Sequence, residues 1–282
     1  MKDARIEHIV ARVKDMPVLP SRLNRIMDIT EDPDSTVEDL EGEILLDQSL
    51  TSRILRLANS AHYGYPRKID TISQAVILLG FQTIKSMALA STVNKMMTRE
   101  LSGYALAKDA LWTQSQTCAI ISRYIARDVG FGNPEKAYIG GLLRDIGKTI
   151  LNHYVDKEYN AISNRVKFGK VSFLEAEEEI LGFNHAQVGG RIAEKWNFPV
   201  ELVEAIGLHH SPERSTEDPK LVSIVHIADS ITMMIGISIG ADGLTYPFSP
   251  FALHELGYDP KDIDQLISRS HDLIVDMDSF NL

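Results

Sequence analysis

The sequence contains a single cysteine, Cys118, so no disulfide can form within the chain, and a reducing compartment suits such a protein. Residues 1–13 mix charged and apolar side chains and lack the apolar core of a signal peptide. The longest apolar stretch, residues 230–241, is too short to cross a bilayer as a helix. We therefore expect a cytoplasmic protein with no membrane partner.

An excess of positive charge is also missing. Lysine and arginine number 29 against 39 aspartates and glutamates, which gives a net charge of −10, and no basic run occurs. Because phosphate contacts need clustered Lys and Arg, we do not expect nucleic acid to be the partner. Hydrophobic residues make up 44% of the 282 positions, which excludes wholesale disorder and allows one large domain or two small ones.

No convincing alternation of apolar and polar residues is present, so we expect few or no strands. Helix signals occur throughout instead, and the sequence predicts an all-α fold without internal repeats. Ser35 with Glu38, and Ser172 with Glu175, have the spacing of capping boxes. Asn133 before Pro134 is typical of a helix start.

Apolar spacing extends these signals into helices. The predicted segments are residues 72–79 ending at Gly80, 111–129, 133–150, 172–182, 184–196, 199–210, a helix from Asp218 through Asp229, and 261–277. A boundary between two lobes is expected near residues 100–103.

Asp145 is the first candidate for chemistry. It follows Leu142 by three residues, so on a helix its carboxylate lies near the apolar side. A buried carboxylate requires a cation, a metal or several hydrogen-bond donors. Lys148, three residues on, is a sufficient cation, and this segment alone therefore favours a structural ion pair.

Histidines form the second group of candidates. His209 and His210 are adjacent at a predicted helix end, where the helix dipole alone favours a histidine. His226 has the position of a packing histidine. Imidazole and carboxylate groups together are typical of a zinc, iron or manganese centre, and the residues that fit one are Asp145, His185, His209, His210 and Asp229. Their long spacing does not show that they converge.

Several motifs carry a resemblance to a known family. Residues 142–148, LLRDIGK, resemble the His-Asp signature of the HD phosphohydrolases, with Arg144 at the histidine position. The HD-related output domain, HDOD, is resembled more closely. The matching segments are 47–50, 55–60, 72–76, 79–80, 111–112, 177–186, 196–199, 205–206 and 209–210, so the resemblance covers residues 15–235.

The resemblance implies an all-α domain from bacterial signalling or regulatory proteins, for which no catalytic activity is established. It implies an N-terminal helical subdomain in residues 1–100, a degenerate HD-type bundle in 101–240 and a helical extension in 241–282. Gly64-Tyr65-Pro66 is interpreted as a turn, because the related HD-GYP enzymes place that motif after their His-His pair.

Two positions depart from the pattern of the active HD enzymes. The first histidine corresponds to Gln114 and the histidine of the pair to Arg144. Gln114 is a poor ligand for a transition metal, and Arg144 is a permanent cation that cannot bind one. Arg144 instead suits a bidentate bond to Asp145, Asp229 or an anionic ligand. The remaining ligands are sufficient for one residual divalent metal, with iron, manganese and zinc as candidates.

Three functions follow from this resemblance. The first is a non-catalytic regulatory module that binds a partner protein, or a small anionic ligand through Gln114, Arg144 and Lys148. The alternative is a metal-dependent phosphohydrolase acting on a nucleotide or cyclic dinucleotide, with Asp145 at its centre and Lys148 contacting phosphate. The third is a structural scaffold or homodimer, for which the apolar loop at residues 246–251 is a candidate contact.

Overall fold

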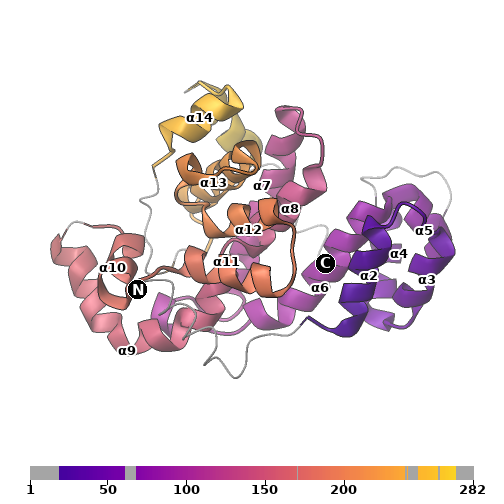
Figure 1. Cartoon of the computed structure of the whole chain (residues 1–282), viewed down its shortest axis with the longest axis horizontal. Helices are drawn as coiled ribbons and strands as arrows, with labels where there is room; N and C mark the ends of the chain where they lie inside the picture. Colours follow the sequence, from indigo (N-terminus) through magenta and orange to yellow (C-terminus); the bar gives the residue numbers. More distant parts are fainter. Residues whose placement is uncertain are drawn as a thin grey trace. The chain divides into compact units, whose positions relative to one another are not determined.

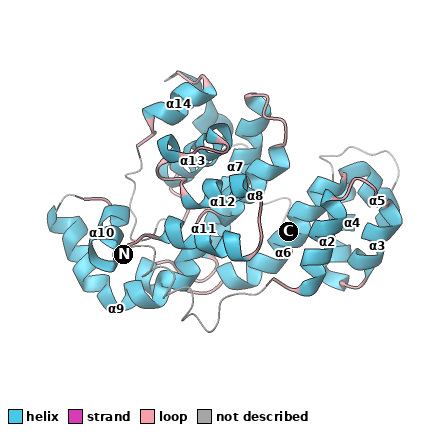
Figure 2. Ribbon diagram, in the orientation of Figure 1, coloured by secondary structure: helices cyan, strands magenta, loops and turns pink. Residues whose placement is uncertain are grey.

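The computed structural model describes residues 19–60, 68–169, 171–238, 240, 247–259 and 261–270, without the side chains of 153–155. Every regular element in these residues is a helix, apart from one isolated bridge between Leu101 and Leu106 (Figure 2). The predicted all-α class is therefore confirmed. Contacts divide the chain between Lys95 and Met96 into two compact units. The described parts are here called the N-terminal unit, residues 19–95, and the bundle unit, residues 96–270.

The N-terminal unit is a small helical array around its own apolar core. Its helices are α2 (Ser21–Glu31), α3 (Val37–Leu45), α4 (Gln48–Ala58), α5 (Ile72–Leu79) and most of α6 (Phe81–Met97), labelled in Figure 1. Helix α3 packs against α2, α4 and α5. The Glu41 carboxylate accepts hydrogen bonds from the backbone and hydroxyl of Ser73, which joins α3 to the start of α5.

The bundle unit contains the remaining elements. They are η2 (Ser102–Tyr104), α7 (Ala110–Asp128), α8 (Pro134–Leu143), α9 (Ile146–Gly169), α10 (Phe173–Leu181), α11 (His185–Lys195), α12 (Val200–Gly207), η3 (Pro212–Arg214), α13 (Pro219–Met234), α14 (Pro250–Leu256) and a helical stretch at 261–270. Helix α7 packs against α8 and α13, while α11 packs against α9 and α12 (Figure 1). Residues 221–233 of α13 are all buried, so α13 is the central helix of this core.

Most predicted helix starts are confirmed at the residue. Asn133, Ser172 and Asn184 cap α8, α10 and α11 through their side-chain oxygens. The predicted capping box at Ser35 is wrong by one residue, because Thr36 caps α3 and Asp39 completes the box.

The helix predicted from Asn133 to Ile150 is two helices in the structure. Helix α8 ends at Leu143, and α9 begins at Ile146 after a turn at Arg144 and Asp145. The helix predicted to reach His210 also ends early, at Gly207, which leaves His209 and His210 in the following turn. Both corrections place candidate site residues in turns between helices, where their side chains are not tied to a helix face.

Hydrogen bonds join Tyr258 and the C-terminal helical stretch to α7. The Tyr258 hydroxyl donates to Asp128, and the guanidinium of Arg269 donates to the Tyr124 hydroxyl.

Three predicted features lie wholly or partly outside the described residues: the turn at 64–66, the end of the helix at 271–277 and residue 246 of the apolar loop. The division into 1–100, 101–240 and 241–282 stays a prediction.

Among the described helices, none is by itself long and apolar enough to span a bilayer. Helices α5 and α6 meet that length and composition criterion only as a pair bent by 109°.

Candidate metal centre and ion-pair cluster

The turn between α8 and α9 is held in place by glycines that allow close helix contact. A Cβ added at Gly141 would lie 2.4 Å from the Ser122 hydroxyl oxygen of α7, and one at Gly147 would lie 2.0 Å from the backbone oxygen of His185. Glycine at these positions lets α8 approach α7 and lets the first turn of α9 approach the first turn of α11. The turn carrying Asp145 is thereby brought next to His185.

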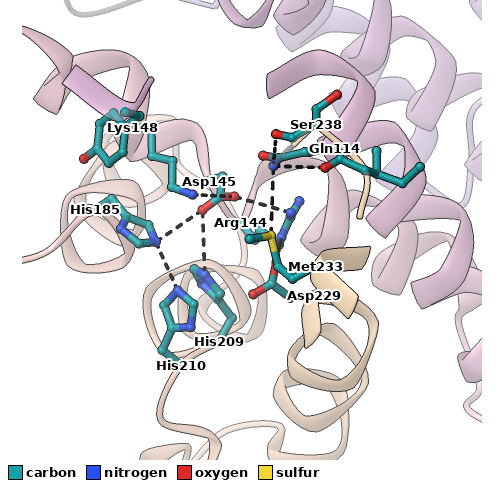
Figure 3. Close-up of polar contacts among 12 residues, drawn as sticks. Gln114, Arg144, Asp145, Lys148, His185, His209, His210, Asp229, Met233 and Ser238 are labelled. Carbon is teal, nitrogen blue, oxygen red and sulfur yellow. Dashed lines mark hydrogen bonds and ion pairs between the residues drawn. The ribbon is translucent and has the colours of Figure 1, made fainter. Parts of the chain in front are cut away.

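Arg144 points into the protein and has no exposed surface. Its Nε lies 2.5 Å from Asp229 Oδ1 on α13, and its Nη2 lies 3.3 Å from Asp145 Oδ2 (Figure 3). Nη1 donates to the Gly141 carbonyl oxygen at 3.2 Å. One guanidinium therefore bridges two buried carboxylates from different elements.

Asp145 is the centre of the cluster, and its two oxygens have different surroundings. Oδ2 faces cations, with Lys148 Nζ at 3.2 Å and Arg144 Nη2 at 3.3 Å. Oδ1 faces histidines, with His185 Nε2 at 3.3 Å and His209 Nε2 at 3.9 Å (Figure 3). The carboxylate thus separates an ion-pair side from an imidazole side.

Three histidines converge on the imidazole side. His185 is the first residue of α11, while His209 and His210 follow the end of α12. One ring nitrogen from each of the three lies within 4.8 Å of the other two, and His185 Nε2 lies 3.0 Å from His210 Nε2. His209 and His185 are fully buried, and His210 is partly buried.

The far nitrogens of two rings are fixed by hydrogen bonds. Nδ1 of His209 lies 2.8 Å from the Ile206 carbonyl oxygen, so Nδ1 carries the proton of the neutral ring. Nε2 then has a lone pair that can bind a metal. Nδ1 of His185 lies 2.7 Å from Glu177 Oε2. Both Nε2 atoms therefore face Asp145.

Burial and neighbouring charges set the protonation of the cluster. Burial opposes ionisation of Asp145, but Lys148, Arg144 and His185 hold the pKa of its carboxyl well below the ordinary value. Burial likewise opposes the charge on Arg144, and the carboxylates of Asp229 and Asp145 nevertheless keep its pKa above the ordinary value.

The three histidines respond differently to burial. It lowers the pKa of His209 to about 4, and burial reinforced by His209 and His185 holds the pKa of His210 well below its ordinary value. For His185, burial is outweighed by Glu177 and Asp145, which raise its pKa to about 9. His209 and His210 are therefore neutral ligands at physiological pH.

The imidazole side fits a single divalent metal. A tetrahedral ion with bonds of about 2.0–2.1 Å separates its ligand atoms by roughly 3.3–3.4 Å. The three histidine nitrogens lie within 4.8 Å of one another, with His185 and His210 at 3.0 Å, and Asp145 Oδ1 lies 3.3 Å from His185 and 3.9 Å from His209, so these separations bracket that value. His209 Nε2 and Asp145 Oδ1 are buried and make no hydrogen bond within the described residues. Three histidine nitrogens with a carboxylate oxygen beside two of them suit zinc or iron.

Asp229 and Gln114, also predicted for the site, take other partners. Asp229 is bonded to Arg144. The amide nitrogen of Gln114 donates to the carbonyl oxygens of Ser238, at 2.8 Å, and Ile237, at 3.2 Å, beyond the end of α13 (Figure 3). His226 is a satisfied packing histidine, because it lies 2.7 Å from the His209 carbonyl oxygen and accepts from the Ser249 backbone.

Sequence reasoning missed the roles of Glu177 and Tyr104. Glu177 is fully buried and contacts His185, and the Tyr104 hydroxyl donates to the other oxygen of the same carboxylate. A signal was present, because Glu177 shares the buried face of α10 with Phe173 and Ala176. A carboxylate on an apolar helix face implies a buried partner.

The fold and this cluster define an HD-related helical domain. The HDOD domain model matches residues 16–212, and the chain belongs to the HDOD family. The resemblance drawn from the sequence is thereby confirmed.

Solved structures of similar proteins agree with this assignment. An HDOD domain protein of unknown function from Geobacter sulfurreducens superposes with a TM-score of 0.77 at 26% identity, over 97% of this chain and 94% of that one. A candidate phosphohydrolase from Shewanella amazonensis SB2B gives 0.66 at 26% identity, over 92% and 97%. A candidate signal transduction protein from Marinobacter aquaeolei VT8 gives 0.74 at 18% identity, over 100% and 66%, which shows the shared fold.

The curated relatives are longer proteins. An uncharacterised protein from Treponema pallidum is 25% identical over 232 residues, which is 78% of this chain and 43% of that protein. The chain thus spans less than half the length of the curated relatives it matches.

Proposed function

We propose that this chain is a regulatory HDOD module in which Arg144 has replaced a metal cation between Asp145 and Asp229. The observation that carries the proposal is the position of the Arg144 guanidinium, which is fully buried and contacts both carboxylates. In the HD enzymes that the motif resembles, the corresponding histidine is a metal ligand. Here the same position supplies a fixed positive charge instead.

This replacement argues against two-metal hydrolysis. Two bound metals lower the pKa of a bridging water and clamp the attacking and leaving oxygens of the displacement. A guanidinium neutralises the carboxylates, but it has no coordination position for water or substrate. Asp229, which is bonded to Arg144, is no longer available as a metal ligand.

Between the two kinds of partner, the cluster favours a protein over a small anion. Arg144 and Lys148 are each less than 4% exposed, and both direct their charge to carboxylates. An anion would have to displace Asp145 or Asp229 to reach them, which costs their ion pairs. We therefore propose that the module acts by binding a partner protein, with the imidazole side retaining one divalent metal.

One observation favours the alternative function, a phosphohydrolase with one metal. Ring nitrogens of His185, His209 and His210 still lie within 4.8 Å of one another, Asp145 Oδ1 faces two of these rings, and the chain is similar to the candidate phosphohydrolase from Shewanella amazonensis. In that case the metal would activate water, and Lys148 would contact the phosphate of a nucleotide or cyclic dinucleotide.

A turnover assay separates the two functions. The untagged protein, purified without chelator, is supplied with manganese, iron, zinc or magnesium and tested on nucleotides and cyclic dinucleotides. We expect no turnover by the parent, and activity in the double variant Gln114→His/Arg144→His would identify the missing ligands as the reason. Metal-dependent turnover by the parent that disappears in Asp145→Ala would contradict the proposal.

Metal content tests the retained site independently of activity. Mass spectrometry of the same preparation should find about one equivalent of zinc, iron or manganese, which is lost in His209→Ala. His254→Ala is the matched control, because His254 is an exposed histidine on α14. Two equivalents in the parent, or equal loss in both variants, would contradict a single site at the three histidines.

A further inference from the structure

Glu177 is not among the proposed metal ligands, but its carboxylate accepts hydrogen bonds from both Tyr104 and His185. Its Oε2 lies 2.7 Å from Nδ1 of His185 and also accepts the backbone N–H of His185, at 3.2 Å. Its Oε1 accepts the hydroxyl of Tyr104. All three side chains have no exposed surface. The Glu177 carboxylate on α10 therefore bonds Tyr104 through one oxygen and His185 through the other.

This arrangement fixes which nitrogen of His185 carries a proton. Both oxygens of Glu177 already accept hydrogen bonds, from the Tyr104 hydroxyl and from the backbone N–H of His185, so the carboxylate is the acceptor and Nδ1 is the donor. Nε2 is then the atom turned toward Asp145 Oδ1 and His210 Nε2, at 3.3 and 3.0 Å. The backbone of His185 cannot shift toward α9, because its carbonyl oxygen already lies against Gly147.

The ring of His209 is oriented in the same way, but by a backbone carbonyl oxygen instead of a carboxylate. The Ile206 carbonyl oxygen accepts from Nδ1 of His209 at 2.8 Å and leaves Nε2 facing Asp145. A histidine that binds a metal commonly donates its other ring N–H to a carboxylate or carbonyl, which orients the ring and raises its basicity. Two rings from different elements are thus oriented toward one point by different acceptors.

We propose that Glu177, held by Tyr104, is a positioning residue that fixes a proton on Nδ1 of His185 and presents Nε2 to a divalent metal. The inference rests on the retained metal site proposed above. A merely structural role for Glu177 predicts something different, namely that it only caps α11 and that its loss lowers stability without changing the histidine ring.

The chain offers a matched control for the capping role. Glu178, the next residue on α10, accepts from the side-chain amides of Asn184 and Gln187 at 2.6 and 3.3 Å. Asn184 is the N-cap of α11. Glu178→Gln therefore perturbs the same helix start as Glu177→Gln without altering an acceptor of a histidine.

Metal affinity and ring protonation are the two measurements. Zinc affinity is determined by competition with a chelator for the parent, Glu177→Gln, Tyr104→Phe and Glu178→Gln. Two-bond ¹H–¹⁵N spectra of the histidine rings in metal-free protein, recorded about one pH unit above the pKa of about 9 so that His185 is neutral, report which of its nitrogens is protonated, and His185→Gln identifies its signals. Urea unfolding of each variant measures the structural cost separately.

We expect Glu177→Gln to weaken zinc binding by about 10–100-fold. Tyr104→Phe should weaken it less, and Glu178→Gln should leave it within about twofold of the parent even where unfolding shows a similar loss of stability. In the parent spectra, Nδ1 of His185 should carry a proton.

Each contrary result has its own meaning. Parent-like zinc affinity in Glu177→Gln, or an equal loss in Glu178→Gln, would overturn the positioning role while leaving the metal site intact. An unprotonated Nδ1 in the parent would overturn it as well. A parent that binds no zinc would overturn the proposed metal site and this inference with it.

Discussion

Arg144 is a charged side chain without contact to solvent. The free-energy cost of burying its charge must therefore be offset by its partners. Removing a guanidinium from water costs several kcal/mol, and only close, hydrogen-bonded carboxylates offset this penalty. Asp229 and Asp145 supply them at 2.5 and 3.3 Å. Loss of one partner from such a group is far more harmful than loss of an exposed ion pair.

Arg144→Met should therefore destabilise the metal-free protein by about 3–5 kcal/mol, because two buried carboxylates lose their shared cation. Urea unfolding measures the change. Arg165→Ala is the control, since Arg165 and Glu179 form an ion pair with both side chains at least 40% exposed. Its removal should change the free energy of unfolding little, because solvent screens an exposed ion pair. Equal effects of the two substitutions would show that Arg144 is not held as described.

Cys118 provides a second prediction for a single residue. The thiol is buried on α7, and burial raises its pKa to about 12. Because the thiolate is the reactive form, the folded protein should react very slowly with a disulfide reagent at pH 8 and fully after denaturation. Since the folded pKa lies above the unfolded value of 9.0, the thiol's contribution to stability is present below pH 9 and is lost as pH rises toward 12. Rapid reaction of the native protein at pH 8 would contradict this.

Single-residue roles could be predicted only in part. The sequence indicated Asp145, Lys148 and the histidines, and the structure brings them together. The sequence also indicated Arg144 as a partner of Asp145, Asp229 or an anionic ligand, but not that Arg144 contacts both carboxylates at once or that Glu177 contacts His185. Asp229 lies 85 residues from Arg144 in the sequence, and Glu177 lies 8 residues from His185. No local sequence pattern predicts that these side chains point toward each other.

At the scale of the helices, tight contacts depend on where glycine occurs. Gly147→Ala should destabilise the protein by about 1–3 kcal/mol or more, because the added Cβ would lie 2.0 Å from the His185 carbonyl oxygen. It should also weaken metal binding, since His185 would have to move.

Gly42→Ala is the control for that substitution. Gly42 lies inside α3 and has no atom within 4 Å of an added Cβ. Replacing it should stabilise the protein by about 0.5–1 kcal/mol through helix propensity. Thermal or urea unfolding of both variants decides the matter, and a stabilising Gly147→Ala would show that α9 and α11 are not in close contact.

Helix boundaries were predictable where one residue alone could cap. Asn133, Ser172 and Asn184 are such cases. At α3, Ser35 and Thr36 are each followed three residues later by an acidic residue, so spacing cannot choose between them, and Thr36 is the cap. The break at Arg144 was missed because the apolar spacing of Leu142, Leu143 and Ile146 continues across it. At the break, the side chains of Arg144 and Asp145 contact charged and imidazole groups from other elements of the bundle.

At the scale of the molecule, the proposed metal site lies entirely within the bundle unit, residues 96–270. A ligand that binds only the folded state slows hydrogen exchange where opening breaks its site. Zinc should therefore slow exchange at the turn after α8, the start of α11 and residues 208–211, and leave residues 19–80 unchanged. Hydrogen-exchange mass spectrometry with and without zinc tests this, and protection confined to residues 19–80 would contradict it.

The position of Asp229 determines how far the domain must extend to remain intact. The family match ends at residue 212, whereas the carboxylate that pairs with Arg144 lies on α13, which packs against α7 and α8. A fragment ending at 212 would leave a guanidinium without its partner and an apolar face without its cover. We expect such a fragment to aggregate on expression, while one that retains α13 and α14 stays in solution. The physical border of this domain therefore lies beyond the border drawn by sequence similarity.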